Sequence, residues 1–422
     1  MRHVIVGASA GGMAAAEAIR KRDPFAEIVM LTDESRPPYY RPLIPYLIYD
    51  GKPESEIVRE PCLTPKNLDL RLDARATKLD PAAHTLMLAD RTTLSYDRLL
   101  LATGASPTRP DIAGLKGPGV FTLRKWEDAL AIATAAKGVT RAVVLGAGRI
   151  GMKSAFALRH LGLSVTVVEL LDRIVPQQLD AASAVIFAEA VKNAGVETIL
   201  GHTLKKINRR TGKITSVALD DDRKIKTDLV VVGVGVRPNL DLAVAGGLKV
   251  NRGLLVDDHL RTSEPDVFAA GDVVETKDVV TGESIVSGIW TNAATMGRIA
   301  GDNMAGGTSV YEGAFGLLNA MELGGLPVIS VGDIHSEPGD GVEVFVEQRG
   351  PAPRYRKLVF RENRLIGLVL VGVIERAGVY QTLIREKVDV SALRRELLGP
   401  RFHYGHYVLS KPKEVDRYVR AG

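Results

Sequence analysis

The sequence of 422 residues predicts an α/β protein with two nested Rossmann-like units and a C-terminal α+β domain. Two observations predict the nested pair. Residues 4–12 and 143–151 each combine an apolar strand, a glycine-rich turn and the start of an Ala-rich helix. Such a turn lets backbone N–H groups and a helix N-terminus receive a pyrophosphate. The third observation is a change of pattern after residue 310, where alternating residues predict antiparallel strands.

Composition narrows the possible classes of protein. The chain is too long for one core, and 45% hydrophobic with 25% charged residues is typical of a globular protein. The net charge of +5 is small, and no aromatic motif accompanies the basic clusters, which argues against nucleic acid as a partner. No apolar run reaches the length of a membrane span. The strand beginning at Val4 leaves no room for a signal peptide, so we expect a cytoplasmic protein.

The first unit can be followed element by element. We expect a strand, turn and helix over 3–22 and a second strand over 27–31. The Pro- and Tyr-rich stretch 37–46 cannot begin as a regular helix, because proline removes donors and restricts its neighbour. A meander follows over 70–95, and the apolar run 96–104 indicates a buried strand.

The second unit repeats this order, and the chain then returns to the first. The expected helices and strands of the remainder are 126–137, 141–162 (strand, turn and helix), 164–169, 181–194, 229–235, 266–272, 291–304, 342–346, 356–360, 365–371, 377–385 and 391–398. These elements predict three domains, which are 1–112 joined with 246–310, then 113–245, and finally 311–422.

The first glycine-rich turn departs slightly from the G-x-G-x-x-G pattern. Ser9 stands at the second glycine, between Gly7 and the pair Gly11-Gly12. Serine is small enough for a phosphate to approach closely, although a turn shaped by sterics alone is the alternative. Asp33 and Glu34 follow the second strand, where a carboxylate accepts from a ribose hydroxyl or caps a helix. The sequence does not decide which of the two points inward.

The second turn is complete. It carries Gly146, Gly148 and Gly151, with Ile150 between the last two. Glu169 ends the following strand at the distance expected for an acid that binds ribose. A carboxylate there would repel a 2′-phosphate, so NADH should be preferred over NADPH, and Arg173 is close enough in sequence to soften that preference. Two dinucleotides on one chain indicate electron transfer between them.

The order of motifs resembles that of the flavin-dependent pyridine-nucleotide-disulfide oxidoreductase family. The resemblance is dense over residues 1–310 and loose beyond. Within the family it is closest to NADH oxidases, rubredoxin reductases and the flavin part of nitrite reductases. It rests on the two glycine-rich turns and on Ala102-Thr103-Gly104, residues 233–239 and residues 268–272.

The resemblance implies that FAD binds to domain 1–112 with 246–310, that NAD(H) binds to domain 113–245, and that domain 311–422 forms an interface. Gly7 and Gly12 would cradle the FAD pyrophosphate with Arg41 as a cation. The helix near Ala293 would direct its positive end at the flavin. The implied cofactor residues are Gly7, Ser9, Gly11, Gly12, Asp33, Glu34, Arg41, Pro42, Ala102, Thr103, Gly104, Gly146, Gly148, Ile150, Gly151, Glu169, Gly235, Gly271, Asp272, Trp290 and Ala293.

The departures from the family pattern concern the reacting groups. Disulfide reductases of the family carry a thiol after the second strand, and this chain has Pro42 and Pro45 there. The single cysteine, Cys62, comes later, cannot form an intrachain disulfide, and is expected to be a small buried residue. Tyr46 stands where ferredoxin reductases carry lysine, and Lys153 stands where they carry glutamate. These two residues are the catalytic candidates, with Lys153 supplying the cation; the alternative is that Lys153 reaches solvent.

With no thiol relay, electrons must leave to an external acceptor. We expect a small acidic redox protein of the rubredoxin or ferredoxin type, steered by the basic tail residues Lys411, Lys413, Arg417 and Arg420. The alternatives are an NADH oxidase that reduces dioxygen, a quinone reductase, and a flavin-containing subunit of a larger complex. We expect a homodimer if the enzyme works alone. The stretch 402–407 holds His403 and His406 without a third ligand, so it predicts an aromatic docking surface and no metal site.

Overall fold

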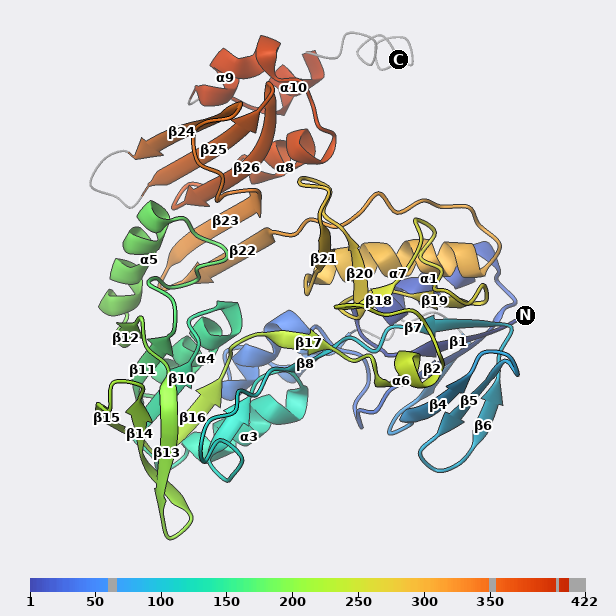
Figure 1. Cartoon of the computed structure of the whole chain (residues 1–422), viewed down its shortest axis with the longest axis horizontal. Coiled ribbons are helices and arrows are strands. Elements are labelled where there is room, and N and C mark those ends of the chain that lie inside the picture. Colours follow the sequence, from blue (N-terminus) through green and yellow to red (C-terminus); the bar gives the residue numbers. More distant parts are fainter. Residues whose placement is uncertain (60–66, 349–353, 400–401, 410–422) are drawn as a thin grey trace.

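The computed structural model describes residues 1–59, 67–348, 354–399 and 402–409. Figure 1 shows three parts: a first α/β unit that holds the N-terminus, a second α/β unit, and a C-terminal sheet with helices. Cys62 and the basic tail residues Lys411 to Arg420 lie outside the described residues. Among the described residues, no helix combines the length and apolarity needed to cross a membrane.

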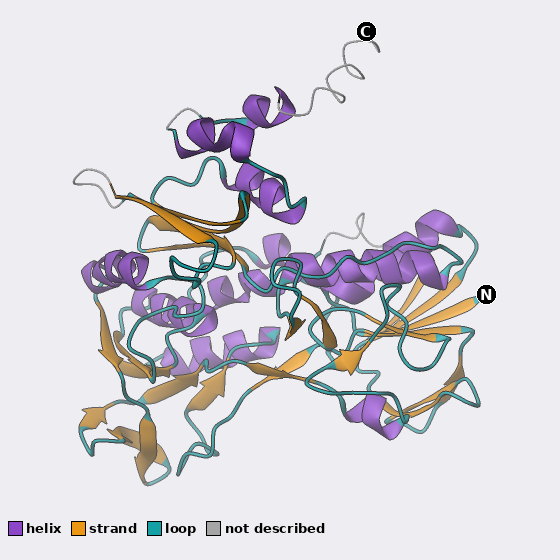
Figure 2. Cartoon of the chain, turned by 45° about the horizontal axis from the view of Figure 1, so that its top comes forward, coloured by secondary structure: helices purple, strands orange, loops and turns teal. Residues whose placement is uncertain are grey.

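The first unit is built on a parallel sheet with the strand order β19-β7-β1-β2-β3. Val4, Ile5 and Leu100 in its central strands are fully buried, as expected when both faces of a parallel sheet are covered. Helices α1 and α7 run side by side over one face (Figure 2). The elements are β1 Arg2–Val6, α1 Ala10–Arg22, β2 Glu27–Leu31, η1 Arg41–Ile48 (a 3₁₀ helix), α2 Glu54–Ile57, β3 Leu68–Arg71, β4 Ala76–Asp80, β5 Thr85–Leu88, β6 Thr93–Ser95, β7 Arg98–Leu101, α6 Asp241–Ala245, β18 Leu254–Leu255, β19 Val267–Ala269, β20 Val274–Lys277, β21 Ser284–Val286 and α7 Trp290–Met304.

The second unit repeats this design with the parallel order β12-β11-β10-β16-β9. A three-stranded antiparallel sheet, β13-β14-β15, is attached to it. The elements are β9 Val120–Thr122, α3 Trp126–Ala136, β10 Arg141–Leu145, α4 Arg149–His160, β11 Ser164–Glu169, α5 Ala181–Asn193, β12 Val196–Leu200, β13 Leu204–Arg210, β14 Lys213–Leu219, β15 Lys224–Lys226 and β16 Leu229–Val232. The predicted nesting of two Rossmann-like units is confirmed by these two sheets.

The chain passes between the two units through an antiparallel pair, β8 Ala105–Pro107 and β17 Val236–Pro238. Leu242 and Ala243 of α6 already belong to the core beneath β1. The chain therefore rejoins the first core a few residues before the boundary at 246 that the sequence suggests. Strand β3 likewise pairs with β2 in the parallel sheet rather than opening a separate meander at residue 70.

The C-terminal part is an antiparallel sheet in the order β22-β23-β26-β25-β24. One face shares a core with the second unit, and the other packs against helices. At the joint, Tyr355 donates to the Asp180 carboxylate at 2.5 Å, and Lys357 Nζ lies 3.6 Å from it. The elements are β22 Leu318–Leu323, β23 Leu326–Gly332, β24 Val342–Gln348, β25 Tyr355–Arg361, β26 Arg364–Val371, α8 Ala377–Arg385, η3 Ser391–Leu393, α9 Arg394–Leu398 and α10 Tyr404–Leu409.

The aromatic stretch 402–407 differs from the expectation of a docking surface. Phe402 is fully buried and stacks on Tyr380 with ring centroids 5.5 Å apart, and Tyr407 is buried in the same core. Tyr404 is exposed. Burial of an aromatic ring stabilises the domain it fills, so Phe402 and Tyr407 close the C-terminal core instead of offering a contact surface.

Candidate functional site at the junction of the two units

The first glycine-rich turn is shaped by close packing. Gly7 has φ of +115°, and a Cβ there would lie 2.1 Å from the Ala102 carbonyl oxygen. A Cβ on Gly12 would lie 1.8 Å from the Gly7 carbonyl oxygen. Ser9 is the N-cap of α1 but makes no side-chain cap bond, so its hydroxyl leaves the N–H groups of the first turn available to a ligand. The turn therefore presents donors at the carboxyl end of β1, as a pyrophosphate site requires.

Arg41 ties this turn to three other segments. Its Nε donates to Ser9 Oγ at 3.1 Å, and its Nη1 donates to the Tyr39 hydroxyl and the Arg124 carbonyl oxygen, both at 3.1 Å. Its Nη2 donates to the Glu34 carboxylate. Tyr39 in turn donates to Glu34 at 2.6 Å, and burial raises the pKa of this hydroxyl, which keeps it a donor. The cation that the sequence assigns to the pyrophosphate is thus fixed beside the turn.

The two acids after β2 have different surroundings. Glu34 is buried and held by Arg41 and Tyr39, whereas Asp33 is half-exposed and pairs with Lys125 at 2.9 Å. The choice that the sequence leaves open is therefore settled in favour of Glu34 as the inward carboxylate. Nothing in the sequence distinguishes two adjacent acids at a strand end.

Asp272 follows β19 and faces the second unit. Its carboxylate forms an ion pair at 2.9 Å with Arg124, which precedes α3. Gly271 has φ of +86° and packs its Cα side against Ala293 in the first turn of α7. Trp290, the first residue of α7, has its ring 5.9 Å from that of Tyr40. Sequence reasoning named Asp272, Ala293 and Trp290 but missed Arg124.

Thr103 and Gly104 lie where the chain leaves the first unit. The Thr103 hydroxyl donates to the Asn239 carbonyl oxygen at 3.0 Å, and the Asn239 side chain donates back to the Thr103 carbonyl at 2.9 Å. These two hydrogen bonds join the segments by which the chain leaves and re-enters the first unit. Asn239 was quoted in a motif but not assigned a role, because its partner lies far away in the chain.

The second turn combines tight packing with open space. A Cβ on Gly151 would lie 1.8 Å from the Gly146 carbonyl oxygen, so Gly151 serves close contact between helix and strand. A Cβ on Gly148 would meet no atom nearer than 3.9 Å, and one on Gly235 would meet none within 4 Å. Packing therefore explains Gly151 but not Gly148. A ligand that passes close to the backbone explains it, so the turn fits a second dinucleotide. Ile150 is partly exposed at the same place.

Glu169 ends β11 beside this turn. Its Oε2 accepts from Ala147 N–H at 2.6 Å, and its Oε1 accepts from Leu171 N–H at 3.0 Å. The carboxylate is buried and fixed by backbone alone, with lone pairs left for a ribose hydroxyl. Arg173 pairs with Asp172 at 2.9 Å rather than with Glu169.

Lys153 crosses from the second unit to the first. Its Nζ donates to the Pro42 carbonyl oxygen at 3.3 Å, and Pro42 directly follows Arg41 in the chain. Burial lowers the pKa of Lys153, and Arg149 lowers it further. Tyr46 lies in η1, with its ring 6.0 Å from that of Tyr49 and Lys52 Nζ 5.8 Å above it. Lys153 thus contacts the segment that follows Arg41, and its role beside the flavin stays a prediction.

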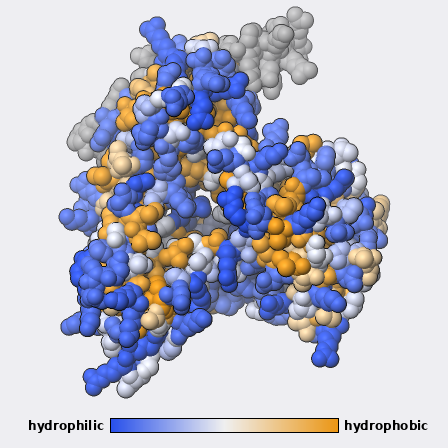
Figure 3. All heavy atoms as spheres, in the orientation of Figure 1, coloured by the Kyte–Doolittle hydropathy of each residue, from blue (hydrophilic) through white to orange (hydrophobic). Residues whose placement is uncertain are grey.

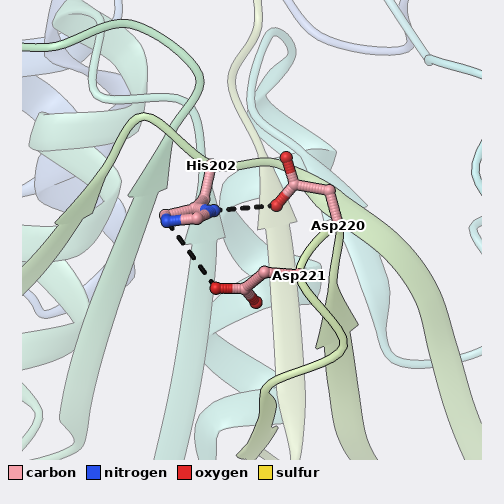
Figure 4. Close-up of side chains that lie close together, drawn as sticks. All are labelled: His202, Asp220 and Asp221. Carbon is pink, nitrogen blue, oxygen red and sulfur yellow. Dashed lines mark hydrogen bonds and ion pairs between the residues drawn. The ribbon is translucent and has the colours of Figure 1, made fainter.

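A separate polar cluster lies on the second unit. His202 Nδ1 is 2.9 Å from Asp220, and its Nε2 is 3.7 Å from Asp221 (Figure 4). Among the described residues, this is the one group spaced closely enough to hold a metal ion. Asp221 also pairs with Arg223 at 2.5 Å. The cluster is therefore explained by a hydrogen bond between His202 and Asp220 and the ion pair of Asp221 with Arg223, outside the junction.

The surface is hollowed between the first unit and the other two parts (Figure 3). Both glycine-rich turns lie at the carboxyl ends of their parallel sheets. Three side chains connect the two units: Arg41 through the Arg124 carbonyl oxygen, Arg124 through Asp272, and Lys153 through the Pro42 carbonyl oxygen. In α/β sheets, this end is where dinucleotides bind. Fold and site together define an oxidoreductase that holds two dinucleotides at one junction.

The chain belongs to the pyridine nucleotide-disulphide oxidoreductase family, whose model matches residues 1–297. Residues 318–388 match the C-terminal domain of rubredoxin NAD⁺ reductases. The chain is accordingly a flavin-dependent NAD(P)H oxidoreductase with FAD and NAD(H) as cofactors. Its one cysteine excludes an intrachain redox-active disulfide.

Similar proteins span nearly the whole chain. The epsilon subunit of NADH-dependent phenylglyoxylate dehydrogenase from Aromatoleum evansii is 31% identical over 97% of both chains. An NADH oxidase from Methanocaldococcus jannaschii is 31% identical over 93% of both. Among solved structures, an NAD-dependent persulfide reductase from A. fulgidus has a TM-score of 0.86 and 28% identity, with 98% of this chain and 84% of that chain covered.

Proposed function

We propose that this chain oxidises NADH and passes the electrons to a separate small acidic redox protein, working as a cytoplasmic homodimer. The observation that carries the proposal is the composition of η1 beside Lys153, which offers Pro42 and Pro45 and no thiol. Bound FAD supplies the hydride chemistry, and the protein supplies position and charge. Without a thiol relay, the electrons leave to an acceptor that does not belong to the chain.

Relatives support an external protein acceptor. Rubredoxin-NAD(+) reductase from Pseudomonas putida is 29% identical over 90% of this chain and 97% of its own length. The match of residues 318–388 to the C-terminal domain of rubredoxin reductases agrees with this. The predicted contact for an acidic carrier is the basic tail, whose lysines and arginines attract negative charge over a distance set by salt.

The test is anaerobic oxidation of NADH by the FAD-loaded protein, with an acidic rubredoxin or ferredoxin as acceptor. We expect fast carrier reduction that slows several-fold between about 0.01 M and about 0.1 M salt, as the screening length falls from about 30 Å to about 10 Å. Replacing Lys411, Lys413, Arg417 and Arg420 by alanine should slow carrier reduction but not ferricyanide reduction. Cys62→Ser should leave both rates unchanged. If oxygen consumption accounts for all turnover and no carrier accelerates it, the chain is an oxidase instead.

A second candidate is a flavin subunit of a larger complex. The Aromatoleum evansii relative, similar over 97% of both chains, is named as the epsilon subunit of a dehydrogenase, which favours this alternative. Gel filtration and co-purification from the native host separate the two. A homodimer without foreign chains supports the free enzyme, and a stoichiometric set of foreign subunits supports the complex.

A further inference from the structure

The first two turns of α4 carry positive charge at the end of the helix where it is least favourable. Arg149 is the first residue of the helix and Lys153 follows four residues later, with no acidic residue in the first turn. The N-terminus is the positive end of the helix dipole, so a cation there is destabilising. Two cations four residues apart also lie on one face and repel each other. The sequence therefore keeps an arrangement that costs the helix stability.

Arg149 is moreover without a partner. Its side chain is partly buried, and no hydrogen bond or ion pair joins it to another residue in the part of the chain that the structure describes. Burial lowers its pKa, and Asp272 across the junction opposes this effect. Asp272 is itself held by Arg124 at 2.9 Å, and Lys153 donates to the Pro42 carbonyl oxygen. Arg149 is thus a partly desolvated charge that faces the first unit, and the described residues offer it only the distant charge of Asp272, which is already paired with Arg124.

An arginine in this state calls for an anion from outside the chain. It does not lose its proton, and its planar group matches the oxygens of a phosphate in pairs. Arg149 directly follows Gly148, and close packing does not explain why a glycine stands at that position. We propose that Arg149 binds the diphosphate of NAD(H) and so positions the dinucleotide across the junction. The inference rests on NAD(H) binding by the second unit and is independent of the electron acceptor.

Binding of two ligands to the oxidised, FAD-loaded protein tests this role. NAD⁺ and ADP-ribose share the diphosphate, but ADP-ribose lacks the nicotinamide. We expect Arg149→Leu to weaken both at least tenfold, which corresponds to about 1.4 kcal/mol. Arg149→Lys should recover part of the loss, because it keeps the charge but not the paired contact. The ligand-free Arg149→Leu protein should also melt at a higher temperature, since an uncompensated charge is gone.

Arg159→Leu is the matched control, because it removes an exposed cation from the last turn of the same helix. It should leave both affinities unchanged. A loss for NAD⁺ without a loss for ADP-ribose would move Arg149 to the nicotinamide end and overturn the assignment. Unchanged affinities for both ligands would overturn it as well. Flavin content and absorption of each variant show that the fold is retained.

Discussion

Each glycine-rich turn, residues 7–12 or 146–151, forms a nucleotide cradle together with the acid at the end of the next strand. The two cradles share this strand, turn and helix arrangement but differ in what holds the acid in place. In the first, the acid Glu34 is held by Arg41 and Tyr39, and Arg41 also holds Ser9 of the turn. In the second, the hydrogen bonds that the described part of the chain gives Glu169 come from backbone N–H groups, those of Ala147 in the turn and of Leu171 in the loop after β11. The comparison teaches that the turn supplies a phosphate site, while side chains from outside the turn decide how firmly it is closed. A closed cradle suits a cofactor that stays, and an open one suits a nucleotide that comes and goes.

The largest expected effect is a loss of folding or of FAD binding when a tightly packed glycine of the first cradle, Gly12, is replaced. Replacing Gly148, a glycine of the second cradle with open space beside it, should be far milder. Gly12→Ala places a Cβ 1.8 Å from the Gly7 carbonyl oxygen and should abolish FAD binding or folding. Gly148→Ala meets no atom nearer than 3.9 Å and should fold with full flavin content but bind NAD⁺ several-fold more weakly. The flavin-to-protein absorbance ratio and an NAD⁺ titration measure both. Loss of flavin from Gly148→Ala would contradict the comparison.

A second difference is sensitivity to acid. His3 in β1 corresponds to Ala142 in β10, and both are buried, but neither ring nitrogen of His3 has a partner. Burial, followed by the charge of the N-terminal amine, lowers the pKa of His3 from 6.5 to about 4. As the pH falls below 6.5, the His3 side chain takes up a proton in the unfolded chain but not yet in the folded protein, and this favours unfolding. Stability should therefore be complete above pH 6.5 and fall by about 3 kcal/mol as the pH drops toward 4.

Urea unfolding at several pH values checks this effect. His3→Leu should remove that part of the pH dependence, because leucine fills a similar space without a titrating group. His84→Leu is the control, since His84 is exposed at its side chain by 43%. An unchanged slope in His3→Leu would show that other groups govern acid stability.

The third test concerns which nucleotide the open cradle accepts. Glu169→Ala removes the carboxylate that would meet a 2′-phosphate, so the ratio of kcat/KM for NADH to that for NADPH should fall at least tenfold, or about 1.4 kcal/mol. Steady-state flavin reduction with each nucleotide measures it. Glu189→Ala, an exposed acid on α5 of the same unit, should leave the ratio unchanged. Equal kcat/KM values for NADH and NADPH in the unaltered protein would contradict the prediction.

The smallest expected effect concerns the cation between the cradles. Lys153 reaches Pro42 from the second unit, so Lys153→Ala should lower the flavin midpoint potential by roughly 30 mV, equivalent to about 1.4 kcal/mol for two electrons. A redox titration measures it, with Lys192→Ala at an exposed position of α5 as the control. An unchanged potential together with an unchanged rate of reduction by NADH would return Lys153 to a solvent-facing role.

The sequence predicts those features that depend on local pattern. The two cradles are readable because strand, turn and helix are contiguous, and the helix Ala377–Arg385 is found at its predicted bounds for the same reason. Residues 391–398, predicted as one helix, divide into a 3₁₀ turn and α9. Proline chemistry correctly excludes a regular helix at the start of residues 37–46, where the structure has a 3₁₀ helix from Arg41.

The remaining features depend on contacts between distant segments. Arg124 meets Asp272 across 148 positions of chain, and Lys153 meets Pro42 across 111. No local pattern announces such pairs. The burial of Phe402 was missed because the sequence pattern near the end of the chain is compatible with either an exposed or a buried aromatic residue. Glu34 and Asp33 could be separated only once the tertiary position of Arg41 was known.

The core shared by the second unit and the C-terminal sheet governs how this chain tolerates rearrangement. Phe156 and Phe187 on one side and Met321 and Val328 on the other are members of the same buried cluster. Cutting between them would leave two apolar faces in water, each inclined to associate. Exposed hairpin tips such as Thr211-Gly212 are better places for an insertion or new termini. Along the sequence the C-terminal part resembles a detachable module, but in three dimensions it completes the unit that precedes it.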